Sequence, residues 1–256
     1  MNDTAFTMIV DDKDIEHFGM RLINYETSSY VGRKTKGVDV PGAHGTQEVP
    51  SALSTRIFLA NVVCTGKDAD EVHTRIRQFF AYMYSTQNAR KVVFTNDMRV
   101  IRYAILDSPE RYKVITGIDG AFTQLKLTFL MQDPFVYQNE PDTLVAAVSH
   151  GKQIILINEG FECPAIYTIK NITNTQITDV GLVVNGELAS FSCNLNAGDV
   201  LVLDTNEFEV KLNGNVRLDY WEGEMPMLKN GDNIIQQYNS QEAELLVTIE
   251  FTKQWV

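Results

Sequence analysis

The sequence predicts a mainly β protein of two modules, the first of which carries a single amphipathic helix. Three observations lead to this fold class. Apolar and polar residues alternate along most of the chain, which is the period of a half-buried strand. Only the segment near residues 69–85 has apolar residues at helical spacing. The alternating strand Leu125–Met131 then runs into Asp133-Pro134, where proline must end the ladder, so we place the modules at residues 1–138 and 142–256.

The first module opens with a small β-element over residues 5–25. Residues 6–10 are expected to form a strand, and residues 19–23 a segment that returns after a turn. Residues 26–50 then lack periodicity, which is unusual for so long a stretch in a compact domain. We expect a long loop here, either a flexible surface loop or a loop that becomes ordered against a partner. The candidate subunit-interface residues of this loop are Arg33, Lys34, Lys36, Pro41, Gly42 and Gly45.

A strand at residues 56–65 leads into the predicted helix. Asp68 stands three residues before Glu71, the capping-box arrangement of an N-cap acceptor and a carboxylate at position N3. We expect the helix to lie on a sheet and its aromatic residues to pack in the core. The further strands of this module are expected at residues 91–95, 99–106 and 122–132, with a turn at Asn96-Asp97 and a short additional strand near 112–115.

The second module consists of short alternating strands and no helix. Its most specific signal is Asn213-Gly214, which favours a type I′ hairpin between residues 208–212 and 216–220. About eight strands with turn residues between them indicate a β-sandwich or jelly roll. The expected strands include residues 153–158, 165–170, 178–184, 189–195, 200–204 and 245–251.

Composition and motifs argue against several classes of function. The net charge of −11 disfavours tight binding to nucleic acid, which is itself a polyanion. The sequence has no run long enough to span a membrane and no secretory signal, so we expect it to fold in the cytoplasm of the cell that makes it. Three cysteines without short spacing and four scattered histidines predict buried thiols and no metal site. No catalytic motif is present, and carboxylate pairs such as Asp11/Asp12 fall in turns, where solvated charge is expected. We therefore expect no enzyme activity and no cofactor.

A cluster of polar and aromatic residues in the second module is the candidate docking or sugar-contact surface. Its residues are Tyr220, Trp221, Glu222 and Asn233. On a strand the neighbouring rings of Tyr220 and Trp221 would point to opposite faces, one of them into the core. The outward ring would suit either a sugar or a protein interface, because tryptophan and tyrosine dominate interface hot spots.

The order of these parts resembles that of a known family. The features in question are His17-Phe18-Gly19-Met20, the loop 40–45, the strand from Arg56 that feeds the helix, Asp133-Pro134-Phe135, and the second-module segments 202–204, 213–214 and 228–234. Together they resemble the distal tail protein (Dit) family of long non-contractile-tailed bacteriophages that infect Gram-positive bacteria. The resemblance spans nearly the whole chain and rests on order and spacing rather than on one specific motif.

The resemblance implies a structural protein of the virion. Members of this family have an N-terminal β-domain that assembles into a hexameric ring, and a C-terminal galectin-like sandwich. The ring joins the tail tube to the tail-tip proteins at the distal end of the tail, and DNA passes through its bore. The sandwich serves either as a docking platform for receptor-binding proteins or as a spacer. The net charge of −11 suggests a bore that repels DNA enough to let it slide.

Two other functions follow from the residues alone. The sandwich could be a carbohydrate-binding module that recognises the host cell wall, because it carries aromatic rings beside polar side chains. A wall hydrolase would need a pair of carboxylates in a cleft, and the sequence gives no reason to place one. The structural hub is the leading hypothesis, and carbohydrate binding is the alternative.

Overall fold

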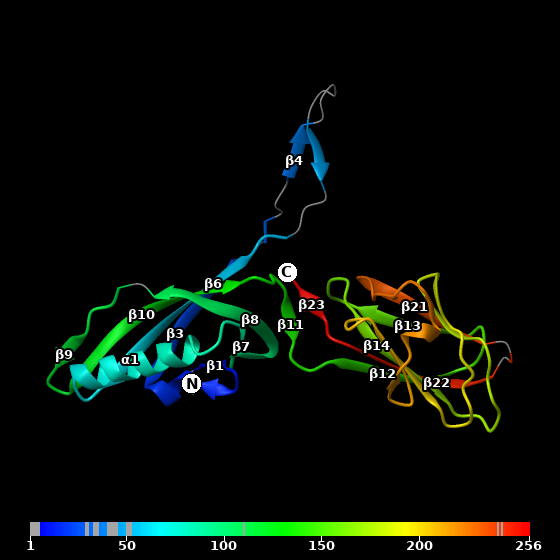
Figure 1. Cartoon of the computed structure of the whole chain (residues 1–256). Coiled ribbons are helices and arrows are strands. Elements are labelled where there is room, and N and C mark those ends of the chain that lie inside the picture. The colour runs from blue at the N-terminus through cyan, green and yellow to red at the C-terminus, as the bar shows by residue number, and fades with distance from the viewer. Residues whose placement is uncertain are drawn as a thin grey trace. The chain divides into compact units, whose positions relative to one another are not determined.

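The computed structural model describes residues 6–28, 31–32, 36–39, 46–49, 53–109, 111–239, 241 and 243–256. The chain forms two compact units, Met1–Val136 with Val256 as unit 1 and Tyr137–Trp255 as unit 2 (Figure 1). Over these residues the protein is mainly β with one α-helix, as the sequence predicts. None of the helices in the described part of the chain has the length and apolar character that a membrane span requires.

Unit 1 is built on a sheet with the strand order β2-β1-β7-β8-β10-β6-β3, to which β9 adds beside β10. Its longest regular ladder joins β6 to β10 from Ala121↔Gly66 to Met131↔Arg56. The elements are β1 (Met8–Val10), β2 (Lys13–Asp14), η1 (Ile15–Phe18), β3 (Met20–Thr27), β4 (Lys36–Asp39), β5 (Thr46–Val49), β6 (Arg56–Gly66), α1 (Ala69–Met83), β7 (Arg90–Phe94), β8 (Asp97–Pro109), β9 (Ile115–Gly117) and β10 (Gly120–Met131).

Helix α1 begins where the sequence predicts. The Asp68 carboxylate accepts a hydrogen bond from the Glu71 amide at 2.8 Å, and the Glu71 carboxylate accepts one from the Lys67 amide at 2.7 Å. The first bond satisfies an amide that the first turn would otherwise leave unpaired, and the second holds the residue that precedes the N-cap. The buried stripe of the helix shares one core with the inner face of the sheet, and Figure 1 shows α1 running along that sheet. The stripe consists of Val72, Ile76, Phe79 and Met83.

The strands of the N-terminal β-element pair differently from the prediction. Strand β1 turns at Asp11 and Asp12, both with positive φ, and pairs with β2 on one side and β7 on the other. The segment expected to return beside β1 is β3, and β3 pairs with β6 instead. The prediction was wrong because alternation marks a strand but carries no information about its neighbour.

Residues 26–50, predicted as a long loop, contain regular structure. Strand β3 continues to Thr27, and β4 pairs with β5 from Lys36↔Val49 to Asp39↔Thr46. The segments Lys-Gly-Val-Asp and Thr-Gln-Glu-Val carry one apolar residue each, so they give no alternating signal. Apolar periodicity therefore does not reveal this pair of strands, because the backbone hydrogen bonds that join strands do not require apolar residues.

Unit 2 is a sandwich of two antiparallel sheets that share one core. The sheet orders are β12-β22-β14-β17-β18-β19 and β13-β21-β15-β16-β20. Its elements are β12 (Asp142–Val148), β13 (Gln153–Asn158), β14 (Ala165–Asn171), β15 (Val180–Val184), β16 (Glu187–Phe191), β17 (Val200–Asp204), β18 (Glu209–Leu212), β19 (Asn215–Val216), η2 (Leu218–Tyr220), β20 (Trp221–Gly223), β21 (Gly231–Tyr238) and β22 (Leu245–Phe251), and two short strands, β11 (Val136–Gln138) and β23 (Gln254–Trp255), pair with each other. The predicted sandwich is confirmed.

The hairpin at Asn213-Gly214 is also present. Both turn residues have positive φ, 49° and 80°, as a type I′ turn requires, and Leu212 pairs with Asn215. The second strand of the hairpin ends at Val216, however, and a 3-10 turn takes up Leu218–Tyr220. The predicted facing of residues 218 and 220 across the hairpin therefore does not occur.

Candidate assembly surfaces

The β4–β5 hairpin is the described part of the candidate interface loop. Its two strands form a sheet of their own and pair with no other strand of the described chain. Lys36 begins β4. The candidate residues Arg33, Lys34, Pro41, Gly42 and Gly45 lie outside the described residues.

The sheet of unit 1 offers two strand edges. In the described part of the chain, β2 is the last strand on one side and β3 the last on the other. Strand β3 is eight residues long, Met20–Thr27, and its far edge exposes backbone donors and acceptors. Such an edge is a template for pairing with another chain, so β3 is a candidate contact surface of unit 1.

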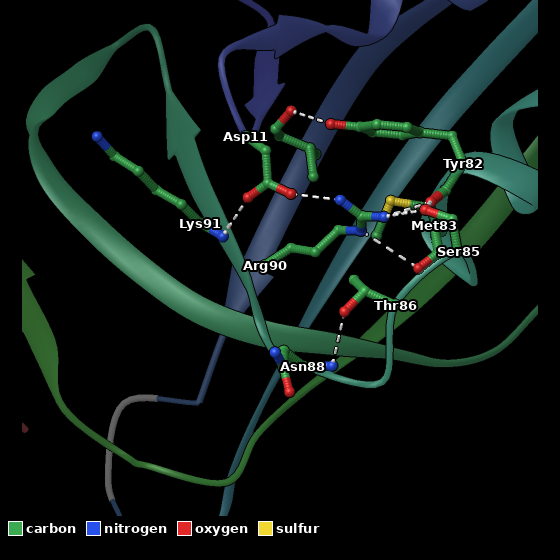
Figure 2. A network of polar contacts seen from close by, with 9 residues as sticks. Asp11, Tyr82, Met83, Ser85, Thr86, Asn88, Arg90 and Lys91 are labelled. Carbon is green, nitrogen blue, oxygen red and sulfur yellow. Dashed lines mark hydrogen bonds and ion pairs between the residues drawn. The ribbon is translucent and has the colours of Figure 1, made fainter.

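The N-terminal strand is fastened to the end of α1 by a buried arginine, Arg90 (Figure 2). Its guanidinium pairs with the Asp11 carboxylate and also donates to the Tyr82 carbonyl, to the Met83 carbonyl at 3.2 Å and to the Ser85 hydroxyl at 2.8 Å. The guanidinium lies 4.4 Å from the centre of the Tyr82 ring. Asp11 also accepts from the Lys91 amide at 2.9 Å. The turn carboxylate that was expected to be simply solvated is thus a structural partner.

The candidate docking surface of unit 2 is only partly exposed. The rings of Tyr220 and Trp221 are half-buried and both pack against the sandwich core, so the expected split between two faces is wrong. Tyr220 ends a 3-10 turn rather than lying within a strand, and strand alternation does not apply there. The Trp221 indole donates to the Gly223 carbonyl at 2.9 Å, and its ring meets the Phe191 ring edge-on at 5.5 Å. Glu222 is exposed.

Asn233 does not belong to that surface. Its side chain is completely buried and makes four hydrogen bonds. It accepts from the Lys229 amide and from the Asn185 side chain, both at 2.8 Å, and donates to the carbonyls of Lys229 at 2.8 Å and Gly231 at 3.0 Å. Its amide is therefore fully used in closing the 229–233 turn and is unavailable to a sugar.

Buried asparagines hold other turns of the sandwich in the same way. Asn158 donates to the carbonyls of Phe161 and Leu228, and Asn171 donates to those of Thr175 and Leu195. Each is completely buried. The sequence does not show that these asparagines hold turns, because the carbonyls to which they donate belong to segments up to 70 residues away.

The described residues offer no evident reaction centre. The three cysteines are free and buried, and burial raises the pKa of the Cys163 thiol to about 11, which makes it a poor nucleophile at neutral pH. Within the described ranges, no three His, Cys, Asp or Glu side chains gather as a metal site would need. The features that the structure does present are strand edges, a separate hairpin and a well-packed sandwich.

Comparison with known proteins gives a consistent result. Residues 160–255 match the family model described as the siphovirus-type tail component, C-terminal domain. The chain is 25% identical over 221 residues to the distal tail protein of Bacillus phage SPP1, which covers 83% of this chain and 82% of that protein.

The fold is shared with the same phage protein. A crystal structure of the SPP1 Dit protein, described as a paradigm of the hub adsorption apparatus in phages that infect Gram-positive bacteria, aligns with a TM-score of 0.77 and 15% identity, covering 98% of this chain and 99% of that one. A chain of the phage P2 baseplate aligns at 11% identity over 97% and 98% of the two chains, with a TM-score of 0.46 that is too low to support an argument.

Proposed function

We propose that the chain is a member of the distal tail protein family of siphophages and that it assembles as a hexameric ring at the distal end of the phage tail. Its role in the tail is that of a structural hub component. The observation that carries this proposal is similarity along the whole chain: both units and their order are matched in the SPP1 protein. A match confined to the sandwich would have supported only a shared domain.

Unit 1 supplies the surfaces that a ring needs in this proposal. A closed ring requires a head-to-tail contact between two different patches of each subunit. The free edge of β3 and the separate β4–β5 hairpin are two such patches, and both belong to the same module. Backbone pairing at an edge would extend the sheet from one subunit to the next.

The ring would join the tail tube protein to the tail-tip protein and surround a channel through which DNA passes without specific binding. Its place is in the virion, after assembly in the host cytoplasm. The chain is acidic, with 33 Asp and Glu against 22 Lys and Arg, which suits a conduit that must not hold DNA. A lumen lined mainly by basic side chains would argue against this part of the proposal.

The sandwich is proposed to be a docking platform for receptor-binding proteins rather than a sugar site. Three features support docking over carbohydrate binding: Asn233 is buried, the Trp221 indole N–H is already bonded, and both rings rest on the core. Binding of the full-length protein to purified host cell walls, lost in Trp221→Ala, would revive the carbohydrate alternative.

The test of the ring is the native mass of the full-length protein, measured by light scattering after gel filtration at two salt concentrations. We expect a species of six times the 28.9-kDa chain, seen as rings by negative-stain electron microscopy. A protein that stays monomeric, both alone and when mixed with the tail tube protein, would refute the ring. The second condition matters because subunit assembly in a tail can depend on a preformed neighbour.

A further inference from the structure

Two buried arginines in unit 1 have side-chain nitrogens that find no acceptor among the described residues. Arg56 begins β6 and Arg102 lies in β8, and their residues are 9% and 8% exposed. Strand β10 lies between these two strands. The Nε of Arg56 and the Nε and Nη1 of Arg102 are enclosed without a hydrogen-bond acceptor, and neither guanidinium forms an ion pair with a described residue.

The contrast with Arg90 shows that this is not how the fold ordinarily treats a buried arginine. Arg90 is 7% exposed, close to the values of the other two, and its guanidinium is met by one carboxylate, two carbonyls and one hydroxyl (Figure 2). A buried donor left without an acceptor carries its full desolvation cost, and a buried charge without a counter-charge costs more. Arg56 and Arg102 each have at least one such donor, and no described carboxylate forms an ion pair with either guanidinium.

The surroundings of Arg102 are largely aromatic. The Arg102 guanidinium lies 5.3 Å from the centre of the Phe94 ring and 5.9 Å from that of Tyr25, and these two rings are stacked at 3.8 Å. Burial lowers the pKa of Arg102 most; the nearby Tyr25 and Asp97 raise it, and the charge of Arg56 lowers it. Stacking on ring faces stabilises a guanidinium but leaves its in-plane N–H donors free for an acceptor.

We propose that Arg56 and Arg102 together bind an oxyanion, a carboxylate or an inorganic anion such as sulfate or phosphate. An oxyanion would supply the missing acceptors and a negative charge in direct contact with the guanidinium groups, and the planar guanidinium matches its geometry in a bidentate contact. Two sources are available. One is an acidic side chain of a neighbouring copy, which this acidic chain offers in excess; the other is a free anion. The binding site itself does not depend on the ring proposed above.

The test is the melting temperature of the full-length protein in sodium sulfate and in sodium chloride at equal ionic strength, which keeps charge screening equal. Sulfate also stabilises proteins generally by exclusion from their surface, so the comparison must be made between variants. We expect wild type to gain an additional, saturable rise of about 3–5 °C that Arg102→Met lacks. Arg99→Met is the matched control, because Arg99 is exposed on the same strand, and it should behave as wild type.

The outcomes separate clearly. Equal sulfate responses in wild type and Arg102→Met, together with equal assembly masses, would overturn the proposal. Should Arg102→Met fail to fold, Arg56→Met takes its place with the same expectation. Light scattering then identifies the source of the oxyanion: a smaller assembly in Arg102→Met but not in Arg99→Met assigns it to a neighbouring copy, and unchanged masses assign it to a free anion. The sulfate response requires no ring, so its loss leaves the proposed assembly untouched.

Discussion

The burial of Asn233 leads to a quantitative prediction about the stability of unit 2. Asn233→Ala removes four hydrogen bonds, two in which the side chain accepts and two in which it donates. At about 1 kcal/mol net for each, the upper limit of the loss is about 4 kcal/mol. The carbonyls of Lys229 and Gly231 are only partly buried, so water can replace some of these bonds. We therefore expect the free energy of unfolding to fall by about 2–3 kcal/mol.

The measurement is urea unfolding followed by tryptophan fluorescence. Both tryptophans of the chain, Trp221 and Trp255, lie in unit 2, so the signal reports that unit. We expect the midpoint to fall by about 1–2 M urea while the slope of the transition stays constant. The matched control is Asn215→Ala, because Asn215 is exposed and makes one long hydrogen bond of 3.4 Å to the Asn213 carbonyl. If the free energy of unfolding falls no further in Asn233→Ala than in this control, the side chain of Asn233 does not stabilise the 229–233 turn.

Three further predictions concern other parts of the chain. Arg90→Met should destabilise unit 1 by about 2–3 kcal/mol, because it removes the ion pair with Asp11 and the donor to the Met83 carbonyl. Circular dichroism should register the loss while the tryptophan transition of unit 2 stays in place. Gly120→Ala should cost about 2 kcal/mol in a urea titration, because Gly120 has a φ of 134° and an added Cβ would lie 2.7 Å from the Gly66 carbonyl oxygen; Gly151→Ala, with a φ of 73° and open space around it, should cost less. Burial raises the pKa of the Cys163 thiol from 9.0 to about 11, so the contribution of this group to stability is complete below pH 9 and is lost as the pH rises toward 11. The urea midpoint of wild type should therefore fall over that interval relative to that of Cys163→Ala. If the two midpoints change with pH in parallel, the pKa of Cys163 is not raised.

Features determined over a few neighbouring residues could be predicted from the sequence. The capping box at Asp68 and Glu71 and the hairpin turn at Asn213-Gly214 each depend on side chains within one turn of the backbone, and both are present as predicted. The strands β13 and β17, which are short apolar runs, begin and end at the predicted residues. Alternation reports which side of a strand is buried, and that is a local property once the strand exists.

The partner of each strand was decided only in three dimensions. Strand β3 pairs with β6 rather than with β1, and β4–β5 forms without an apolar pattern. Backbone hydrogen bonds are the same for every residue type except proline, so they leave little trace in the sequence. The candidate interface residues in the 26–50 region depend on this pairing and stay a prediction.

The roles of the polar residues were likewise settled by tertiary structure. From the sequence we expected Asn233 to lie on a binding surface, but its side chain is buried and stabilises a turn. We expected Asp11 to be a solvated turn residue, but it pairs with Arg90, 79 positions away. The unpaired state of Arg56 and Arg102 has no local signature either. A polar side chain takes its function from the groups that surround it, and those groups come from distant parts of the chain. The sequence by itself therefore determined the mainly β, two-module fold class and the locally encoded turns and caps. The tertiary structure decided how the strands pair, which charges and amides are satisfied, and which still require a partner.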